Sequence, residues 1–146
     1  MKKIVWGAVC LLWGLMGGLC AASSFDHPLK LQGETFQVAL ASTPKSLKKG
    51  LMGVTNLPKD HGMLFIFPKT REVTFWMKDT PLDLDLVYLD RTGKVLQLEE
   101  LKANSLRHVP SKMPVRAALE LPAGTVKRLH LKVGASVSCE ALKVTF

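Results

Sequence analysis

The chain has 146 residues, with 20 Lys and Arg against 12 Asp and Glu and a formal net charge of +8. This length provides one hydrophobic core and therefore one domain. The lysines are scattered rather than interleaved with exposed aromatics, which argues against a nucleic-acid-binding surface. The 3 cysteines cannot form a disulfide framework, so the fold must rest on apolar packing.

Residues 1–22 have the layout of a secretory signal peptide. Two lysines precede an uncharged apolar run over residues 4–19, and small residues follow. We expect cleavage after Ala22, and hence export to the periplasm or cell envelope. An uncleaved anchor is the alternative, because the run approaches the roughly 17 to 25 residues that span a bilayer. A lipid-modified Cys20 is disfavoured because the large Leu19 precedes it.

Processing would remove Lys2 and Lys3 and leave 18 basic against 12 acidic side chains, a net charge of +6. Charge of this size favours weak contact with anionic surfaces. We expect a monomer that contacts a membrane only through an uncleaved leader. The rest of the chain divides into a short tether, residues 23–30, and one globular domain, residues 31–146.

The first elements of the domain are a strand and a short helix. Thr35–Ala41 alternates apolar and polar residues, which predicts a strand with one buried face. Thr43 and Pro44 indicate a helix start, with a hydroxyl cap and a proline in the first turn. This helix is expected to run from Pro44 to Met52.

The centre of the domain is Gly62–Asp85. Met63–Phe67 is continuously apolar, which predicts a strand buried on both faces. Val73–Met77 follows a charged connection as a second strand, so the two strands are expected to pair as a hairpin.

A second hairpin follows. Leu82–Leu89 predicts a strand whose first half exposes Asp83 and Asp85. A turn signal at Asp90–Gly93 leads into the partner strand Val95–Leu101. The stretch from residue 102 to 114 has no apolar period and is typical of a long surface loop.

Three segments complete the domain. Val115–Leu121 predicts a strand, and Thr125–Leu131 fits a helical turn or a strand, with Thr125 as a cap favouring the helix. Val137–Phe146 predicts a terminal strand that closes a sheet and buries Cys139. The expected fold class is mainly β (α+β): a compact single domain, either a partly closed β-barrel or a sandwich, with one or two short helices.

A polar cluster follows the second central strand and provides the candidate site. Crowded carboxylates suit acid–base work or a hard cation, although a solvated strand end is the simpler interpretation. No catalytic residue is assigned. The candidate ligand-binding residues are Trp76, Met77, Lys78, Asp79, Thr80 and Asp85.

Sulfur and aromatic side chains suggest a weaker alternative. Thioether ligands select Cu(I), but methionine beside tryptophan is more typical of core packing. No metal-ligand spacing, nucleophile motif or phosphate-binding loop occurs, so no metal is assigned and no cofactor is expected. The residues of this alternative are Met52, Met63, Met77, Trp76 and His61.

Several ordered motifs resemble one protein family. They read GLM at 50–52, GMLF at 62–65, FWMKDT at 75–80 and LD at 84–85. The sequence resembles domain of unknown function 192, also called uncharacterised protein family 0127, from about Leu31 to Val137. The resemblance implies a small mainly β domain, often exported behind a signal or anchor, with no established activity.

The sequence also departs from that family. Members usually carry arginine at Val54, asparagine at Asp79 and proline at Asp83, and Ala135 replaces the aspartate of a late Gly-Asp pair. The other candidate ligand-binding positions match the family pattern: Trp76, Met77, Lys78, Thr80 and Asp85.

The leading functional hypothesis is a non-enzymatic exported module that binds an unknown small molecule or envelope component. The cluster contains polar groups but no nucleophile–base pair. The alternatives are an enzyme acting on envelope carbohydrate or peptide through Asp79 and Asp85, and a periplasmic metal-binding protein using methionine and Trp76.

Overall fold

The computed structural model describes residues 24–143, so the expected signal peptide lies outside the described residues. Within the described part of the chain, no helix has the length and apolar character needed to cross a membrane. The strands are β1 (His27–Leu31), β2 (Glu34–Ala41), β3 (His61–Arg71), β4 (Thr74–Phe75), β5 (Leu84–Leu89), β6 (Val95–Leu101), β7 (Val109–Pro110), β8 (Val115–Pro122) and β9 (Val137–Cys139), and the helical segments are α1 (Pro44–Lys49), α2 (Thr125–Arg128) and η1 (Glu140–Lys143).

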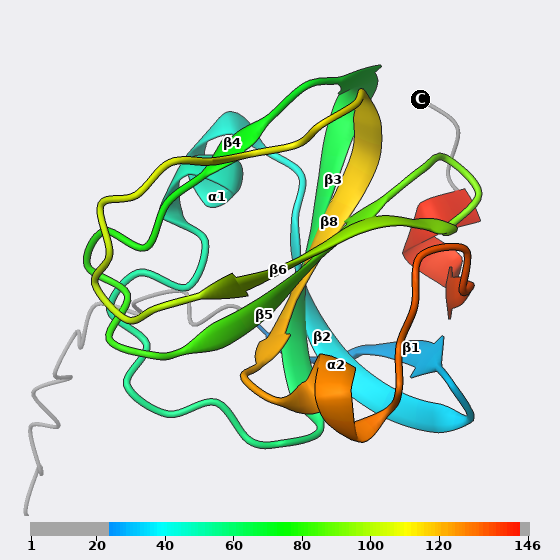
Figure 1. The fold of residues 1–146 in the computed structure, drawn as a ribbon, viewed down its shortest axis with the longest axis horizontal. Helices are drawn as coiled ribbons and strands as arrows, with labels where there is room; N and C mark the ends of the chain where they lie inside the picture. The colour runs from blue at the N-terminus through cyan, green and yellow to red at the C-terminus, as the bar shows by residue number, and fades with distance from the viewer. Residues whose placement is uncertain (1–23, 144–146) are drawn as a thin grey trace, which may run out of the picture.

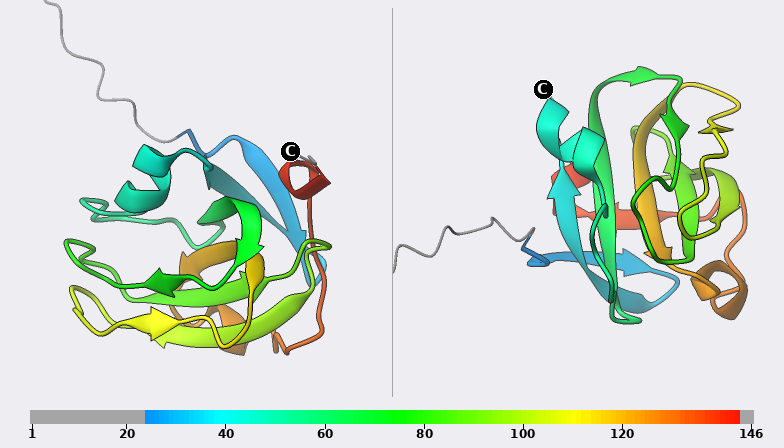
Figure 2. Two further views of the ribbon diagram at one scale, coloured as in Figure 1. Left: turned by 90° about the horizontal axis from the view of Figure 1, so that it is seen from above. Right: turned by 90° about the vertical axis from the view of Figure 1, so that its left-hand side faces the viewer.

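One curled sheet organises the molecule (Figure 1). Its strand order is β6-β5-β8-β3-β2-β1-β9, and β4 pairs with β7 in a separate two-stranded ribbon. The two edges of the large sheet meet where Lys94 forms a bridge with Ser136, and the Val95 N–H donates to the Ala135 carbonyl at 2.8 Å. Figure 2 shows the resulting curl from two further directions. The mainly β fold with a partly closed barrel and two short α-helices is therefore confirmed.

Two apolar layers cover the two faces of the sheet. The first takes side chains from every strand of the large sheet and fills the space inside the curl. The second lies on the other face, beneath α1 and the β4–β7 ribbon. Alternation along β5 sends Val87 into the first layer and Leu86 and Tyr88 into the second, because successive strand residues point to opposite faces.

The expected hairpin between Met63–Phe67 and Val73–Met77 is wrong. β3 lies between β2, which it pairs in parallel, and β8, which it pairs antiparallel, while β4 pairs only with β7. A strand buried on both faces needs partners on both edges. The eight-residue strands β2 and β8 provide longer partners than the two-residue β4.

Smaller differences lie at the ends of elements. Residues 27–30, expected in the tether, belong to β1, where Leu29 and Leu31 are buried against the sheet. α1 ends at Lys49, because Gly50 adopts φ +48° and directs the chain out of the helix. The terminal strand ends at Cys139, which is buried as expected, and η1 follows it.

The other expected strands are confirmed. β2, β5, β6 and β8 form within a residue or two of the predicted ranges, and the Asp90–Gly93 turn joins β5 to β6. The Asp90 carboxylate stabilises this turn by accepting from the Thr92 N–H at 2.7 Å and the Lys94 N–H at 3.0 Å. Partial burial raises the pKa of Asp90, but the Thr92 hydroxyl and these N–H donors together outweigh it and hold the pKa below its usual range.

Candidate functional site

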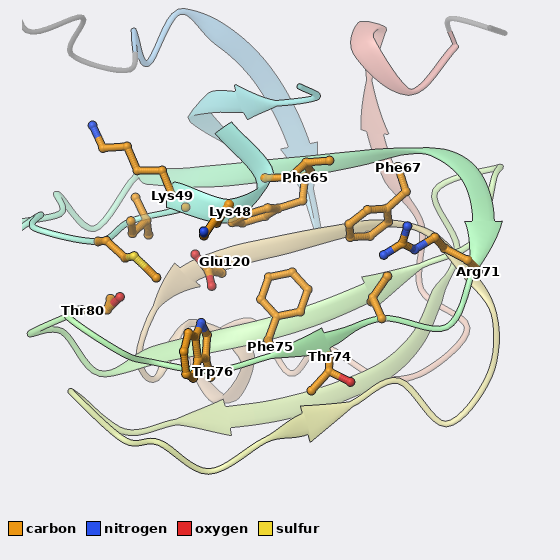
Figure 3. Close-up of a pocket in the computed structure, with 15 residues that line it drawn as sticks. Lys48, Lys49, Phe65, Phe67, Arg71, Thr74, Phe75, Trp76, Thr80 and Glu120 are labelled. Atoms are coloured by element: carbon orange, nitrogen blue, oxygen red, sulfur yellow. The ribbon is translucent and has the colours of Figure 1, made fainter. Parts of the chain in front are cut away.

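A pocket of about 280 Å³ opens on the second apolar layer, between α1, the end of β3, β4 and β8. Figure 3 shows its side chains. Its walls are largely aromatic, its mouth carries exposed cations, and one acidic side chain enters it from β8. These groups are Phe65, Phe67, Phe75 and Trp76 on the walls, Lys48, Lys49 and Arg71 at the mouth, and Glu120 from β8.

Helix α1 brings two of the cations to the pocket. Thr43 caps the helix: its hydroxyl accepts from the Ser46 N–H at 3.2 Å, and the Ser46 hydroxyl accepts from the Thr43 N–H at 3.0 Å. This reciprocal capping fixes the start of a helix of only six residues. Lys48 and Lys49 occupy its last turn, where positive charge is favoured by the helix dipole.

The aromatic wall is held by packed rings and one buried hydroxyl. Phe75 contacts Phe65 edge-on with a centroid distance of 5.0 Å, and it contacts Tyr88 at 5.8 Å. The Tyr88 hydroxyl donates to the Val109 carbonyl at 2.7 Å and so holds β7, the partner of β4, against the sheet. Burial raises the pKa of Tyr88, which keeps this hydroxyl protonated as a donor.

Glu120 is the least satisfied side chain of the pocket. It is 4% exposed, its partners across the neighbouring strands are Met63 and Leu86, and its Oε2 has no hydrogen-bond partner among the described residues. Burial raises the pKa of Glu120 to about 8. A buried polar group without a partner costs on the order of 1–3 kcal/mol, so this carboxyl needs a functional explanation.

Two of the sequence candidates line this pocket, Trp76 and Thr80. Trp76 is 42% exposed, with the Lys78 ammonium 5.6 Å from its ring centroid and His108 packed edge-on at 6.1 Å. Thr80 is buried, and its hydroxyl donates to the Lys78 carbonyl at 3.2 Å. Lys78 itself is exposed.

The remaining candidates lie elsewhere. Met77 is buried in the second apolar layer, and Asp79 is exposed in a turn with φ +54°, a conformation that asparagine and aspartate tolerate well. Asp85, expected to be exposed, is 3% exposed and lines a different pocket of about 340 Å³. Its Oδ2 accepts from the Val126 N–H at 2.7 Å, so the carboxylate fixes the start of α2.

The acid–base pair suggested by the sequence, Asp79 and Asp85, does not share a pocket. Thr80 faces the aromatic pocket, but Asp85 alternates with Leu84 and Leu86 and points to the other face of the sheet. Asp79 lines neither the aromatic pocket nor the pocket of Asp85. Among residues 24–143, no group of three His, Cys, Asp or Glu side chains is arranged to hold a metal ion.

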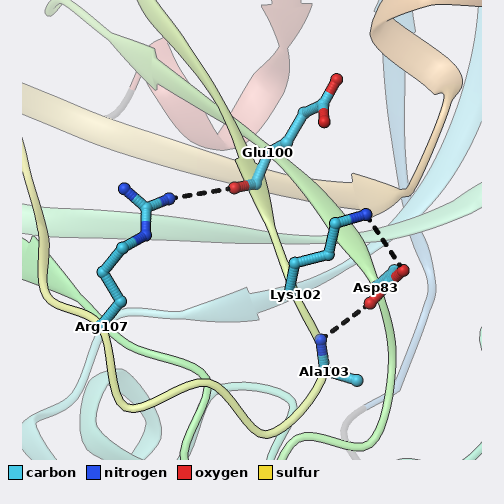
Figure 4. Close-up of polar contacts among 5 residues, drawn as sticks. All are labelled: Asp83, Glu100, Lys102, Ala103 and Arg107. Atoms are coloured by element: carbon cyan, nitrogen blue, oxygen red, sulfur yellow. Dashed lines mark hydrogen bonds and ion pairs between the residues drawn. The ribbon is translucent and has the colours of Figure 1, made fainter.

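Asp83, where the resembling family usually has proline, has its own structural role (Figure 4). Its carboxylate accepts from the Ala103 N–H at 2.8 Å and lies 3.4 Å from the Lys102 ammonium. These contacts, first the Ala103 N–H, hold the pKa of Asp83 below its usual value. The aspartate thus ties the start of β5 to the residues that follow β6.

Sequence reasoning missed the cations and the acid of the pocket. The signal for Glu120 was present, because Val115–Leu121 is a buried strand pattern interrupted by one carboxyl between Leu119 and Leu121. No comparable signal marks Lys48, Lys49 or Arg71, which are surface residues brought together by the fold.

Comparison with known families identifies the chain. A family model for DUF192, described as uncharacterized ACR, matches residues 27–139. The chain belongs to this family. The resemblance seen in the sequence is thereby confirmed, and the match covers every strand of the DUF192 sheet from β1 to β9.

Solved structures support the same fold. A protein of Sinorhizobium meliloti 1021, described as a candidate transcription regulator, is 37% identical with a TM-score of 0.74, over 77% of this chain and 92% of that one. A protein of unknown function from Novosphingobium aromaticivorans DSM 12444 is 29% identical with a TM-score of 0.73. The match covers 76% of this chain and 83% of that one. No curated protein matches this DUF192 member.

Proposed function

We propose that this protein is an exported, non-enzymatic module of the cell envelope that binds one small molecule in the aromatic pocket. The observation that supports this proposal is Glu120, a buried carboxyl that faces the pocket without a partner among the described residues. Such a group destabilises the fold, and a ligand that donates a hydrogen bond to it would offset that cost.

The dimensions of the pocket favour a small ligand. Pockets for drug-sized molecules have volumes of roughly 300–1,000 Å³, and this pocket of about 280 Å³ lies just below that range. A metabolite of a few heavy atoms would be enclosed by the rings of Phe65, Phe75 and Trp76. A polymer or folded partner could contact only the mouth.

Export is expected from the leader and is directly testable. If residues 1–22 are a cleaved signal peptide, the protein recovered from a periplasmic extract should begin at Ser23. Cytoplasmic marker proteins in the same extract provide the control. Recovery of the chain in the cytoplasm with Met1 or Lys2 at its N-terminus would contradict export.

Ligand binding can be followed through Trp76. The chain has 3 tryptophans, and replacing Trp6 and Trp13 by phenylalanine leaves Trp76, on the pocket wall, as the sole tryptophan. We expect at least one member of a panel of amino acids, amines, organic acids, sugars and phosphate esters to change its emission saturably. Binding energy in such a pocket also stabilises the fold, by roughly 2.7 kcal/mol at a ligand concentration of 100 times Kd.

Two variants locate the binding site. Phe75→Ala removes a pocket wall and should weaken the response at least tenfold, whereas Asp85→Asn, in the other pocket, should leave it unchanged. Asparagine keeps an oxygen that can accept from the Val126 N–H, so the control variant retains the start of α2. If no compound changes either the emission or the melting temperature, the proposed function is wrong.

A further inference from the structure

We propose that the ligand is a small zwitterion, whose primary ammonium group binds Glu120 inside the pocket and whose anionic group stays at the mouth with Lys48, Lys49 and Arg71. This inference rests on the proposed function and deepens it by naming the chemical class of the ligand. Three independent features of the pocket support it: an unsatisfied acid, aromatic walls and a cationic mouth.

The acid requires a donor that the protein does not provide. Glu120 lies between the apolar side chains of Met63 and Leu86, and its Oε2 has no partner among the described residues. The nearby hydroxyl of Tyr88 is engaged with the Val109 carbonyl. A ligand N–H is therefore the missing donor, and a charged N–H supplies both the hydrogen bond and the counter-charge that a buried carboxylate needs.

The surrounding cations do not take that role. Among the described residues, no ion pair joins Glu120 to Lys48, Lys49 or Arg71, and burial is the cause of its raised pKa. The titratable groups that line the pocket beside Glu120 are those of Lys48, Lys49 and Arg71. The other titratable groups on the elements around it do not line the pocket: Lys45 on α1, His61 and Lys69 on β3, Asp85 and Tyr88 on β5, and Arg116 on β8 itself.

The aromatic walls favour a cation at the inner end of the ligand. The rings of Phe65, Phe75 and Trp76 line the space beside Glu120 (Figure 3). A cation near an aromatic ring gains roughly 0.5 to 2 kcal/mol, most where water is excluded. An ammonium group that reaches Glu120 therefore also meets these aromatic rings.

The mouth selects the opposite charge. Lys48, Lys49 and Arg71 are exposed, and none of them forms an ion pair within the described residues. Three cations repel a ligand that carries only positive charge and attract one that carries an anion. A molecule with an ammonium at one end and an anion at the other matches both halves of the pocket.

Proton release distinguishes this ligand from others. Without ligand, the pKa of about 8 keeps Glu120 largely protonated at neutral pH. Binding of an ammonium favours the carboxylate, so the proton leaves to the buffer and affinity should rise roughly tenfold per pH unit between about pH 6 and 7.5. A ligand that accepts a hydrogen bond from protonated Glu120 would show the reverse dependence.

The test is calorimetric titration of the full chain with a series of zwitterions. The probes are the ω-amino carboxylates from glycine to 6-aminohexanoate and O-phosphorylethanolamine, each compared with its matched alkylamine and its matched carboxylate or phosphate ester. We expect one length to bind at least tenfold tighter than both single-charge relatives. Buffers with different ionisation enthalpies should report release of about one proton at pH 6.5.

Two variants test the contacts of the ammonium end and of the anionic end of the ligand separately. Glu120→Gln keeps the shape of the side chain but should abolish proton release and weaken zwitterion binding at least tenfold. A Lys48→Gln, Lys49→Gln double variant should reduce the ratio by which the zwitterion binds more tightly than its matched alkylamine. Proton release on binding should persist in this variant. If O-phosphorylethanolamine is the best probe, sedimentation with phosphatidylethanolamine vesicles tests whether the same headgroup is bound on a lipid.

The outcomes separate this inference from the function it rests on. Tight binding of anion-only or neutral compounds, with affinity that falls as the pH rises, would overturn the zwitterion and leave a small-molecule-binding module. Equal binding by the wild type and Glu120→Gln at every pH would also overturn it. Absence of binding by every probe in both panels would overturn both proposals.

Discussion

Replacing Glu120 by glutamine is expected to stabilise the ligand-free protein increasingly as the pH rises from about 4.5 to 8. The pKa of this carboxyl is about 8 in the fold, against 4.5 for an exposed glutamate. Between these values the unfolded chain has lost the proton that the folded chain keeps. Folding then binds a proton, so the wild type loses stability as the pH rises, by up to 1.4 kcal/mol per pH unit.

The expected size of the effect is large for one side chain. Glutamine is neutral at every pH, so the variant and the wild type should differ by less than about 1 kcal/mol at pH 4.5. At pH 8 the variant should be more stable by on the order of 3–5 kcal/mol. Urea unfolding at pH 4.5, 6 and 8 measures the difference.

An exposed glutamate provides the matched control. Glu100 precedes the end of β6 and its side chain is exposed, so Glu100→Gln should change the free energy of unfolding by less than about 0.5 kcal/mol at all three values of pH. Parallel pH profiles for the wild type and Glu120→Gln would contradict the assignment of Glu120 as a buried, unpaired acid.

Replacing Gly93 by alanine is expected to destabilise the seam of the barrel, the line where residues 93–95 meet residues 135–137 and the two edges of the large sheet come together. Gly93 has φ +82°, and an added Cβ would lie 2.3 Å from the Val137 carbonyl oxygen. The Val137 N–H also donates a hydrogen bond to the Gly93 carbonyl at 2.8 Å, so the two backbones cannot move apart without weakening it. Positive φ costs roughly 1–2 kcal/mol for alanine, and forced separation of the segments adds roughly 1–3 kcal/mol.

Gly33→Ala separates these two contributions. Gly33 also has a positive φ, +80°, but no atom lies within 4 Å of its added Cβ. Its replacement should therefore cost only the conformational part, roughly 1–2 kcal/mol. Urea unfolding of both variants isolates the steric part, and equal destabilisation would show that the seam tolerates the extra carbon.

Local chemistry made part of the fold predictable. The turn at Asp90–Gly93 encodes its own geometry through a carboxylate that accepts from the following N–H groups, and it sets the β5–β6 hairpin. The cap at Thr43 is equally local. Such elements need only contacts between residues a few positions apart, which the sequence displays directly.

Pairing between distant segments was not predictable in the same way. The apolar residues of β3 show that the strand is buried, but not that its partners are β2 and β8. The grouping of residues around the pocket was not predictable for a related reason. Asp85 follows Thr80 closely in sequence, yet it points to the other face of the sheet, while Glu120 reaches the pocket from a strand 40 residues further along.

The seam between the ends of the sheet sets when the protein can finish folding. Leu29 pairs with Cys139, and Lys94 pairs with Ser136, so the first and last strands of the domain are neighbours. Until residues 136–139 are synthesised, β1 and β6 remain open edges that can pair with other chains. Closure of so long a loop is entropically costly and slow. The growing chain therefore stays exposed to aggregation until residues 136–139 are made.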